Sequence, residues 1–274
     1  MPAPNTISSE KLSRLVGTPR CPVLVDLRID EDYAADPRLV PGAVRRAHGA
    51  VGEWGPALAG LSIVAICQAG AKLSEGAAAW LRHLGAAAEV LEGGFEAWRD
   101  SGGMLLRADR IPPRDAQGRT VWVTRARPKI DRIACPWLIR RFVDRAAVFL
   151  FVAPGEVAAV AERFDATPFD IEGVFWSHRG EACSFDTMVE EFGLGDAALL
   201  RLARVVRAAD TARPGLAPEA AGLLAASLGL SRMYSDDLEQ LEAGMTLYDA
   251  FYRWSRDATG ETHNWPSRKP GAAQ

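Results

Sequence analysis

Cysteine and histidine are scarce in this chain, and the cysteine spacing excludes a common kind of metal site. The 274 residues include only four cysteines and four histidines. No two cysteines are separated by just two residues, so a structural zinc site built from cysteine pairs is not expected. The cysteines also lack the short paired spacing of a disulfide framework, and we expect free thiols. They are Cys21, Cys67, Cys135 and Cys183.

Long apolar runs and an excess of basic charge are also missing. No apolar run reaches the length of a membrane-spanning helix, and the first residues, MPAPNTISSEKLSRLVGTP, lack the apolar segment of a signal peptide. We therefore expect a cytoplasmic protein with no membrane partner. The net charge of −3 does not favour a nucleic-acid partner. A length of 274 residues favours two domains.

Strand-like and helix-like patterns alternate through the first hundred residues. Short apolar runs predict buried strands at residues 22–26, 61–66 and 89–91. Between the last two, apolar side chains recur at helical spacing over residues 73–84, and Gly85 ends the helix. Strands that alternate with helices predict an α/β fold with a mainly parallel sheet.

The composition changes at residues 107–119, RADRIPPRDAQGR, which are charged and contain proline. We predict a first domain at 1–107, a linker at 108–119 and a second domain at 120–274. The second domain is expected to be mostly α-helical (α+β). Its predicted helices cover residues 184–192, 199–206, 216–228 and 238–252, and its predicted strands cover 147–152 and 174–176.

The strand at residues 61–66 runs directly into Cys67, a loop of small residues, and Lys72. Such a loop at a helix start can turn its backbone N–H groups toward one anion. The helix dipole and Lys72 add positive charge. This setting favours a thiolate nucleophile that carries a negatively charged sulfur adduct. The alternative is a buried, unreactive cysteine at the end of a strand.

Four segments of the first domain resemble the rhodanese family of sulfurtransferases, in the right order and spacing. They are VLVDLR (23–28), VPGA (40–43), CQAGAK (67–72) and LEGGFEAW (91–98). The resemblance implies a rhodanese-type parallel sheet flanked by helices. It makes Cys67 the catalytic residue, which takes sulfur from a small donor such as thiosulfate and passes it to a thiol or cyanide-type acceptor.

The same resemblance implies that no cofactor is needed and that the loop binds the substrate. The loop residues are Gln68, Ala69, Gly70, Ala71 and Lys72. The loop length matches the sulfurtransferases rather than related phosphatases. Lys72 stands where the family often has arginine, so it supplies charge without a bidentate fork. Asp26 and Arg28 are expected to hold the domain together rather than to catalyse.

Two polar segments carry the candidate chemistry of the second domain. The first, RARPKIDRIACPWLIRRFVDR (125–145), has seven basic and two acidic residues. Pro136 fits the first turn of a helix, which would put Cys135 near the N-cap in a positive environment. The alternative is an amphipathic helix whose arginines point outward.

The second segment, SHRGEACSFDTM (177–188), brings residue types that bind metals and transfer protons into one short stretch. They are His178, Glu181, Cys183 and Asp186. We hypothesise that this stretch faces Arg132 and Cys135 across one cleft, with Asp131 and Asp210 at its edge. A divalent metal on His178 and Asp186 and an oxyanion on the arginines would then share the cleft. The alternative is that the polar groups cap helices and the cysteines are buried. His83 and His263 are expected to have no role.

Residues 120–265 resemble the C-terminal domain of ChrB-type chromate-resistance proteins. The resemblance rests on RPKIDRIACPWLIRRF (127–142), on residues 178–186 and on LGLS (228–231). It implies a link to chromate or oxidative stress but supplies no reaction. Regulators of this type carry a DNA-binding domain where this chain has its rhodanese-like half, so no nucleic-acid partner is inferred. Two interpretations remain: a sulfurtransferase coupled to a metal- or oxyanion-binding domain, or a non-enzymatic chromate or metal sensor with an inert or regulatory rhodanese module.

Overall fold

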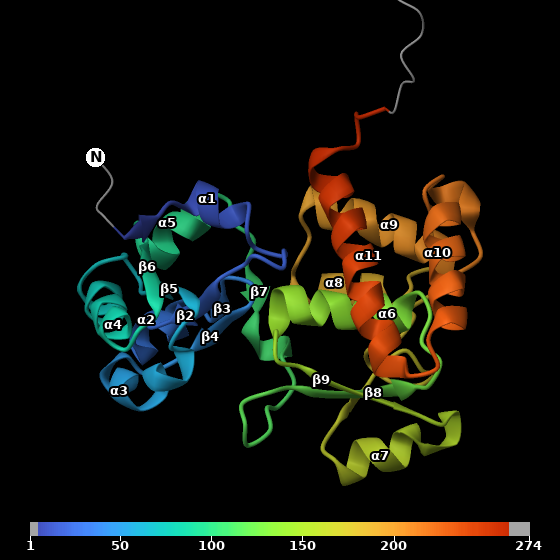
Figure 1. Cartoon of the computed structure of the whole chain (residues 1–274), viewed down its shortest axis with the longest axis horizontal. Helices are drawn as coiled ribbons and strands as arrows, with labels where there is room; N and C mark the ends of the chain where they lie inside the picture. Colours follow the sequence, from blue (N-terminus) through green and yellow to red (C-terminus); the bar gives the residue numbers. More distant parts are fainter. Residues whose placement is uncertain (1–4, 263–274) are drawn as a thin grey trace, which may run out of the picture.

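The computed structural model describes residues 5–262, which form two lobes that lie against each other (Figure 1). Within this range no helix has the length and apolar character required to cross a membrane. His263, to which the sequence assigned no role, lies outside the described residues.

A five-stranded parallel sheet forms the first lobe, with the strand order β1-β6-β5-β2-β4. The strands are β1 (Thr6–Ile7), β2 (Val23–Asp26), β4 (Ala43–Arg45), β5 (Ser62–Ile66) and β6 (Ala87–Leu91). The helices are α1 (Ser9–Ser13), α2 (Asp30–Ala35), α3 (Val51–Trp54), α4 (Lys72–His83) and α5 (Gly94–Asp100). Four consecutive residues of β5 are buried, as expected for a strand covered on both faces. The predicted α/β fold is confirmed.

The chain leaves the first lobe through β7 (Leu106–Arg107), which pairs antiparallel with β3 (Arg38–Leu39). A short 3₁₀ turn at Ala108–Arg110 opens the segment predicted as a linker.

The second lobe combines a small parallel sheet with six helices among its described residues. Its strand order is β10-β8-β9, with β8 (Val121–Arg125), β9 (Val148–Val152) and β10 (Thr167–Pro168). The helices are α6 (Asp131–Leu138), α7 (Val157–Arg163), α8 (Ser184–Phe192), α9 (Ala197–Asp210), α10 (Ala220–Met233) and α11 (Asp237–Asp257). The lobe is mostly helical, as predicted.

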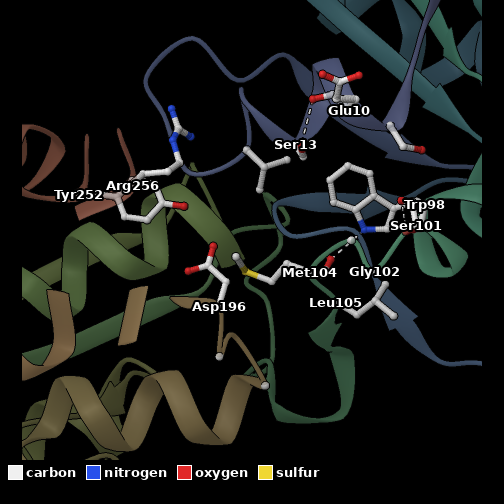
Figure 2. Close-up of a pocket in the computed structure, with 15 residues that line it drawn as sticks. Glu10, Ser13, Trp98, Ser101, Gly102, Met104, Leu105, Asp196, Tyr252 and Arg256 are labelled. Carbon is white, nitrogen blue, oxygen red and sulfur yellow. Dashed lines mark hydrogen bonds between the residues drawn. The ribbon is translucent and has the colours of Figure 1, made fainter. Parts of the chain in front are cut away.

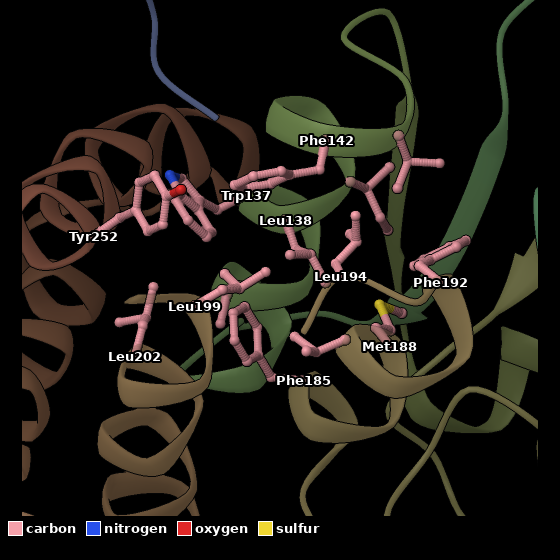
Figure 3. Packing of buried hydrophobic residues seen from close by; sticks show 14 of the residues in the cluster. Trp137, Leu138, Phe142, Phe185, Met188, Phe192, Leu194, Leu199, Leu202 and Tyr252 are labelled. Atoms are coloured by element: carbon pink, nitrogen blue, oxygen red, sulfur yellow. The ribbon is translucent and has the colours of Figure 1, made fainter. Parts of the chain in front are cut away.

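Helix α6 lies at the centre of this lobe, packed among α8, α9 and α11 (Figures 1 and 3). Trp137 is fully buried, and its ring centroid is 5.7 Å from that of Phe142 and 5.4 Å from that of Tyr252. Its indole N–H donates to Asp249, which also accepts two 2.8 Å bonds from Arg141. The alternative of outward-pointing arginines is therefore wrong for Arg141, because α11 supplies a carboxylate partner.

Three boundary predictions for the second lobe are wrong. Pro136 lies inside α6 rather than in its first turn, so Cys135 is in the helix interior and fully buried. Residues 174–176 are not a strand; Trp176 makes only an isolated bridge to Phe169. Helix α10 continues through Gly229 to Met233, since a single interior glycine costs only about 1 kcal/mol, which tertiary packing can offset.

One apolar cluster runs through both lobes. It includes Leu12 and Trp98 from the first lobe and Phe142 and Phe192 from the second. Gly17, with a φ of 75°, is a point of close approach between the lobes, because a Cβ there would lie 2.3 Å from the Phe142 ring. The lobes are thus packed against each other and not merely tethered.

We predict that Gly17→Ala destabilises the protein by about 1–3 kcal/mol more than Gly60→Ala, as measured by chemical denaturation. The two glycines have nearly the same positive φ, 75° and 78°, but a Cβ at Gly60 meets nothing within 4 Å. The difference therefore isolates the clash with Phe142 from backbone strain. Equal losses of stability would show that the lobes can separate at little cost.

Candidate functional site

Cys67 lies where β5 ends, at the carboxyl edge of the first sheet. Its side chain is 4% exposed. The Ala71 backbone N–H donates to the sulfur over 3.3 Å, and the Ser74 hydroxyl lies 3.1 Å from it. Both contacts come from the first turn of α4 or the residue before it. The sulfur is therefore held at the N-terminal end of a helix, as the loop sequence predicted.

The Cys67 loop is fixed by the glycine pair that begins α5. Backbone N–H groups of Phe95 and Glu96 donate to the carbonyl oxygens of Cys67 and Gln68 over 2.9 and 3.1 Å. Gly94 has a φ of 62°, and a Cβ there would lie 2.3 Å from the Cys67 carbonyl oxygen. The glycines at 93–94 thus allow two separate segments to approach closely.

The remaining loop residues are arranged around this contact. Gln68 donates from its side-chain amide to Glu96 over 3.0 Å. Gly70 has a φ of 67°, and Ala69, Ala71 and Lys72 are exposed. Sequence reasoning missed Ser74. A serine in the first turn of the helix that follows the loop is nevertheless a signal that can be detected in the sequence.

Asp26 and Arg28 form a buried ion pair beneath the carboxyl edge of the sheet. Arg28 donates to both oxygens of Asp26, the shortest contact being 2.7 Å, and to the carbonyl oxygens of Asp36 and Arg38. Its guanidinium lies 3.7 Å from the centroid of the Phe95 ring. These contacts tie β2, the segment before β3 and α5 together, which fits the structural role expected of the pair.

A second polar cluster lies at the carboxyl edge of the small sheet. His178 Nε2 is 3.6 Å from Asp131 Oδ2, 3.5 Å from Asp170 Oδ1 and 3.2 Å from Asp210 Oδ2. Asp131 begins α6, Asp170 follows β10, and Asp210 ends α9. Segments distant in the sequence thus surround one imidazole with three carboxylates.

Asp131 is fully buried, and its two oxygens are used differently. Oδ2 accepts from the backbone N–H groups of Ser184 and Phe185, over 2.5 and 3.3 Å, at the start of α8. Oδ1 has no hydrogen-bond partner among residues 5–262. The preceding residue, Ile130, has a φ of 38°, which is strained for a β-branched side chain.

The cluster shifts the pKa values of its members. The pKa of Asp131 is raised well above its usual range, first by burial and then by the nearby charges of Asp210 and Asp170. Burial likewise raises the pKa of Asp210. The hydrogen bond to Asp170 and the other two carboxylates raise the pKa of His178 to about 9, against the effect of burial. The site therefore favours positive charge at its centre.

Two arginines flank Asp170. Arg132 Nε lies 3.4 Å from Asp170 Oδ2, and its Nη1 donates to the carbonyl oxygens of Arg125 and Ala126. Arg125 is more exposed and lines a surface pocket of about 600 Å³ together with Asp170, Ser177 and His178. Both arginines thus contact protein groups, since Arg125 Nη2 donates to the Asp170 carbonyl oxygen over 3.1 Å, but of the two only Arg125 lines the pocket.

The predicted cleft is present in part. His178, Asp131, Arg132 and Asp210 are brought together, and Asp131 lies inside the cluster rather than at its edge. Asp170, which the sequence analysis passed over, belongs to the group of possible metal ligands among the described residues, and Asp186 does not.

The other candidates have structural partners. Asp186 accepts from the Cys183 backbone N–H over 3.0 Å and caps α8. Cys183 is the fully buried N-cap of α8, and the next residue, Ser184, donates its hydroxyl to Asp170 over 2.7 Å. Glu181 is exposed and pairs with Arg213. For Cys135, burial and then the nearby charges of Asp131 and Asp170 raise the pKa of the thiol well above its usual range. The charged groups that act on Cys135 are thus carboxylates, and the positive environment predicted for it is wrong.

A further cavity, of about 520 Å³, lies between the lobes (Figure 2). Trp98 and Met104 line it from the first lobe, and Asp196, Tyr252 and Arg256 line it from the second. It contains neither Cys67 nor any member of the His178 cluster.

Each lobe matches a known protein-family model. A model of the rhodanese-like domain matches residues 8–101, and a model of the ChrB C-terminal domain matches residues 122–255. The chain therefore resembles a rhodanese-like domain followed by a ChrB C-terminal domain, and neither match alone spans half of the chain.

Individual proteins with similar sequences or structures each match only part of the chain. Protein ChrB of Cupriavidus metallidurans is 38% identical over 150 residues, which is 53% of this chain and 44% of that protein, so the match spans less than half of that relative. A rhodanese-related protein from Thermoplasma volcanium is 18% identical, with 38% of this chain and 98% of that chain covered and a TM-score of 0.33. A thiosulfate sulfurtransferase from Pseudomonas aeruginosa is 24% identical, with 37% and 19% covered and a TM-score of 0.30.

We predict that Arg28→Met lowers the free energy of unfolding by about 3–5 kcal/mol, because it leaves the buried Asp26 carboxylate unpaired. Arg38→Met is the matched control: Arg38 pairs with Asp36 at the same sequence spacing but is 46% exposed. It should cost less than about 1 kcal/mol. Denaturant titration measures both, and similar losses would contradict the structural role of the Asp26–Arg28 pair.

Proposed function

We propose that the protein is a sulfurtransferase that carries sulfane sulfur on Cys67. The observation that carries this proposal is the position of the Cys67 sulfur, between the Ala71 N–H and the Ser74 hydroxyl at the start of α4. The Ala71 N–H is a hydrogen-bond donor at a helix N-terminus, where negative charge is stabilised. The Ser74 hydroxyl now donates to the Ala71 carbonyl oxygen over 3.0 Å, and it can rotate to donate to the sulfur instead. The same environment would favour both the attacking thiolate and the persulfide that it forms.

The reaction has two displacement steps. The Cys67 thiolate attacks the outer sulfur of thiosulfate, the sulfur–sulfur bond of the donor breaks, and sulfite leaves with the electron pair. An acceptor such as cyanide or a thiolate then attacks the terminal sulfur of the Cys67 persulfide. The bond between the two sulfurs breaks, and the Cys67 thiolate is restored. No redox cofactor is needed, because electrons only move within these bonds.

Lys72 is the cationic residue of the loop. It is the first residue of α4 and is exposed, so its ammonium group can reach a donor approaching the carboxyl edge of the sheet. A donor with a sulfonate-type oxyanion would gain a charge-assisted contact there.

We predict that wild-type protein produces thiocyanate from thiosulfate and cyanide and that Cys67→Ser abolishes this activity. Cys21→Ser is the matched control, since Cys21 is partly exposed and should not contribute. Lys72→Ala should lower kcat/KM for thiosulfate about tenfold, the loss expected for one charge-assisted contact. Full activity in Cys67→Ser would contradict the assignment of Cys67 as the sulfur carrier. A stable, correctly folded wild type without activity toward any sulfane donor would favour the sensor interpretation.

We further propose that the second domain recognises a small oxyanion, with chromate as the first candidate. The match to the ChrB C-terminal domain supports this link, and so does the pocket in which Arg125 lies beside Ser177. The Arg125 side chain is 42% exposed, and a guanidinium in such a pocket suits a tetrahedral dianion.

Chromate, and sulfate as a redox-inert anion of the same shape, should therefore raise the melting temperature of the wild type but not of Arg125→Ala. Arg163→Ala, at an exposed position on α7, should respond like the wild type. Equal shifts in all three proteins, or none, would rule out this pocket.

A further inference from the structure

We infer that the second domain binds one first-row divalent cation, such as Mn²⁺, Fe²⁺ or Zn²⁺, between Asp131, Asp170 and His178. One potential ligand atom of each residue lies within 4.8 Å of the others. This site lies in the other lobe from Cys67 and takes no part in the proposed sulfur transfer, so the two proposals stand or fall separately.

The three ligands come from different elements that meet at one sheet edge. Asp131 follows β8 at the start of α6, Asp170 follows β10, and His178 lies in the segment that leads into α8. The carboxyl ends of parallel strands are where ligands bind in open α/β sheets. The group is therefore assembled by the tertiary fold and is not a local run of acidic residues.

The unpartnered oxygen of Asp131 points to a missing ligand. Asp131 is 0% exposed, and its Oδ1 finds no hydrogen-bond partner in the described part of the chain. Oδ2 of the same carboxylate is 3.6 Å from His178 Nε2, so the carboxylate that carries the unpartnered oxygen belongs to the cluster. A buried polar atom without a partner costs about 1–3 kcal/mol, and more when charged. A bound cation would remove that cost.

Neighbouring groups hold the ligands in place, as they do around known metal sites. The backbone N–H groups at the start of α8 fix Asp131 Oδ2. The Ser184 hydroxyl donates to Asp170 Oδ1, and Arg132 lies 3.4 Å from Asp170 Oδ2. The strained turn before Asp131 is held as well, since the Tyr248 hydroxyl donates to the Ile130 carbonyl oxygen over 3.0 Å.

The donor set selects the class of metal. Carboxylate oxygens suit Mn²⁺ and Mg²⁺, whereas imidazole nitrogen suits Fe²⁺ and Zn²⁺. A mixed set with one imidazole favours a first-row transition ion over Mg²⁺. His178 and Asp170 also line the pocket of about 600 Å³, which gives the ion a path from solvent. Metal binding requires the neutral imidazole, so a proton carried by His178 Nε2 would pass to solvent when the ion binds.

The test uses the full chain, stripped with a chelator and titrated with Mn²⁺, Zn²⁺ and, separately, Mg²⁺. Bound metal is measured by elemental analysis, and Mn²⁺ is also followed by electron paramagnetic resonance. We expect about one Mn²⁺ or Zn²⁺ per chain. His178→Ala and Asp170→Asn should each weaken binding about tenfold or more. Asp131 is left unchanged, because its loss would also remove the contact that fixes the start of α8.

Two control variants distinguish binding at this site from metal uptake by histidines and carboxylates elsewhere on the protein. His83→Ala removes an exposed histidine of α4, and Asp186→Asn removes the carboxylate that caps α8; both should bind metal like the wild type. The proposal is overturned if folded wild type takes up neither Mn²⁺ nor Zn²⁺, or if His178→Ala binds as well as the wild type. Loss of binding in Asp186→Asn but not in Asp170→Asn would also overturn it.

Discussion

Both candidate sites depend on backbone N–H groups at the start of a helix, which must find a hydrogen-bond acceptor outside that helix. The first N–H groups of a helix have no acceptor within the helix, so they need one from outside. At the start of α4 the Cys67 sulfur takes this role for Ala71. At the start of α8 the Asp131 carboxylate takes it for Ser184 and Phe185. In each lobe the group that is drawn to the helix end also lies at the carboxyl edge of a parallel sheet, where a ligand can approach.

The two sites differ in how far they can be predicted from the sequence. The Cys67 loop is local: its strand, its small residues and its helix are adjacent, and the glycines that hold it in place form a motif of their own. The His178 cluster instead joins residues from three separate parts of the second lobe, near positions 131, 170–178 and 210. Asp170 was missed because it follows a strand of only two residues, too short to show a pattern. Asp186 was chosen in its place because sequence spacing cannot tell a helix cap from a ligand.

The same limit explains the error at Cys135. Pro136 is typical of a first helical turn, but tertiary packing places it inside α6, where Trp137 and its aromatic neighbours surround the helix. Burial is the largest cause of the raised pKa values of three cysteine thiols. It raises the pKa of Cys21 to about 11, and it raises the pKa values of Cys135 and Cys183 far above their usual range, with help from Asp131. Burial therefore disfavours the thiolate form at these three cysteines.

The most direct test of Cys67 as the sulfur carrier is to locate the transferred sulfur. The full chain is incubated with thiosulfate, freed of excess donor, digested without reductant, and its cysteine peptides are weighed by mass spectrometry. We predict one added sulfur atom on the peptide that contains Cys67 and none on the peptides that contain Cys21, Cys135 or Cys183. Added sulfur on another cysteine, or on several cysteines to the same extent, would contradict the assignment of sulfur transfer to Cys67.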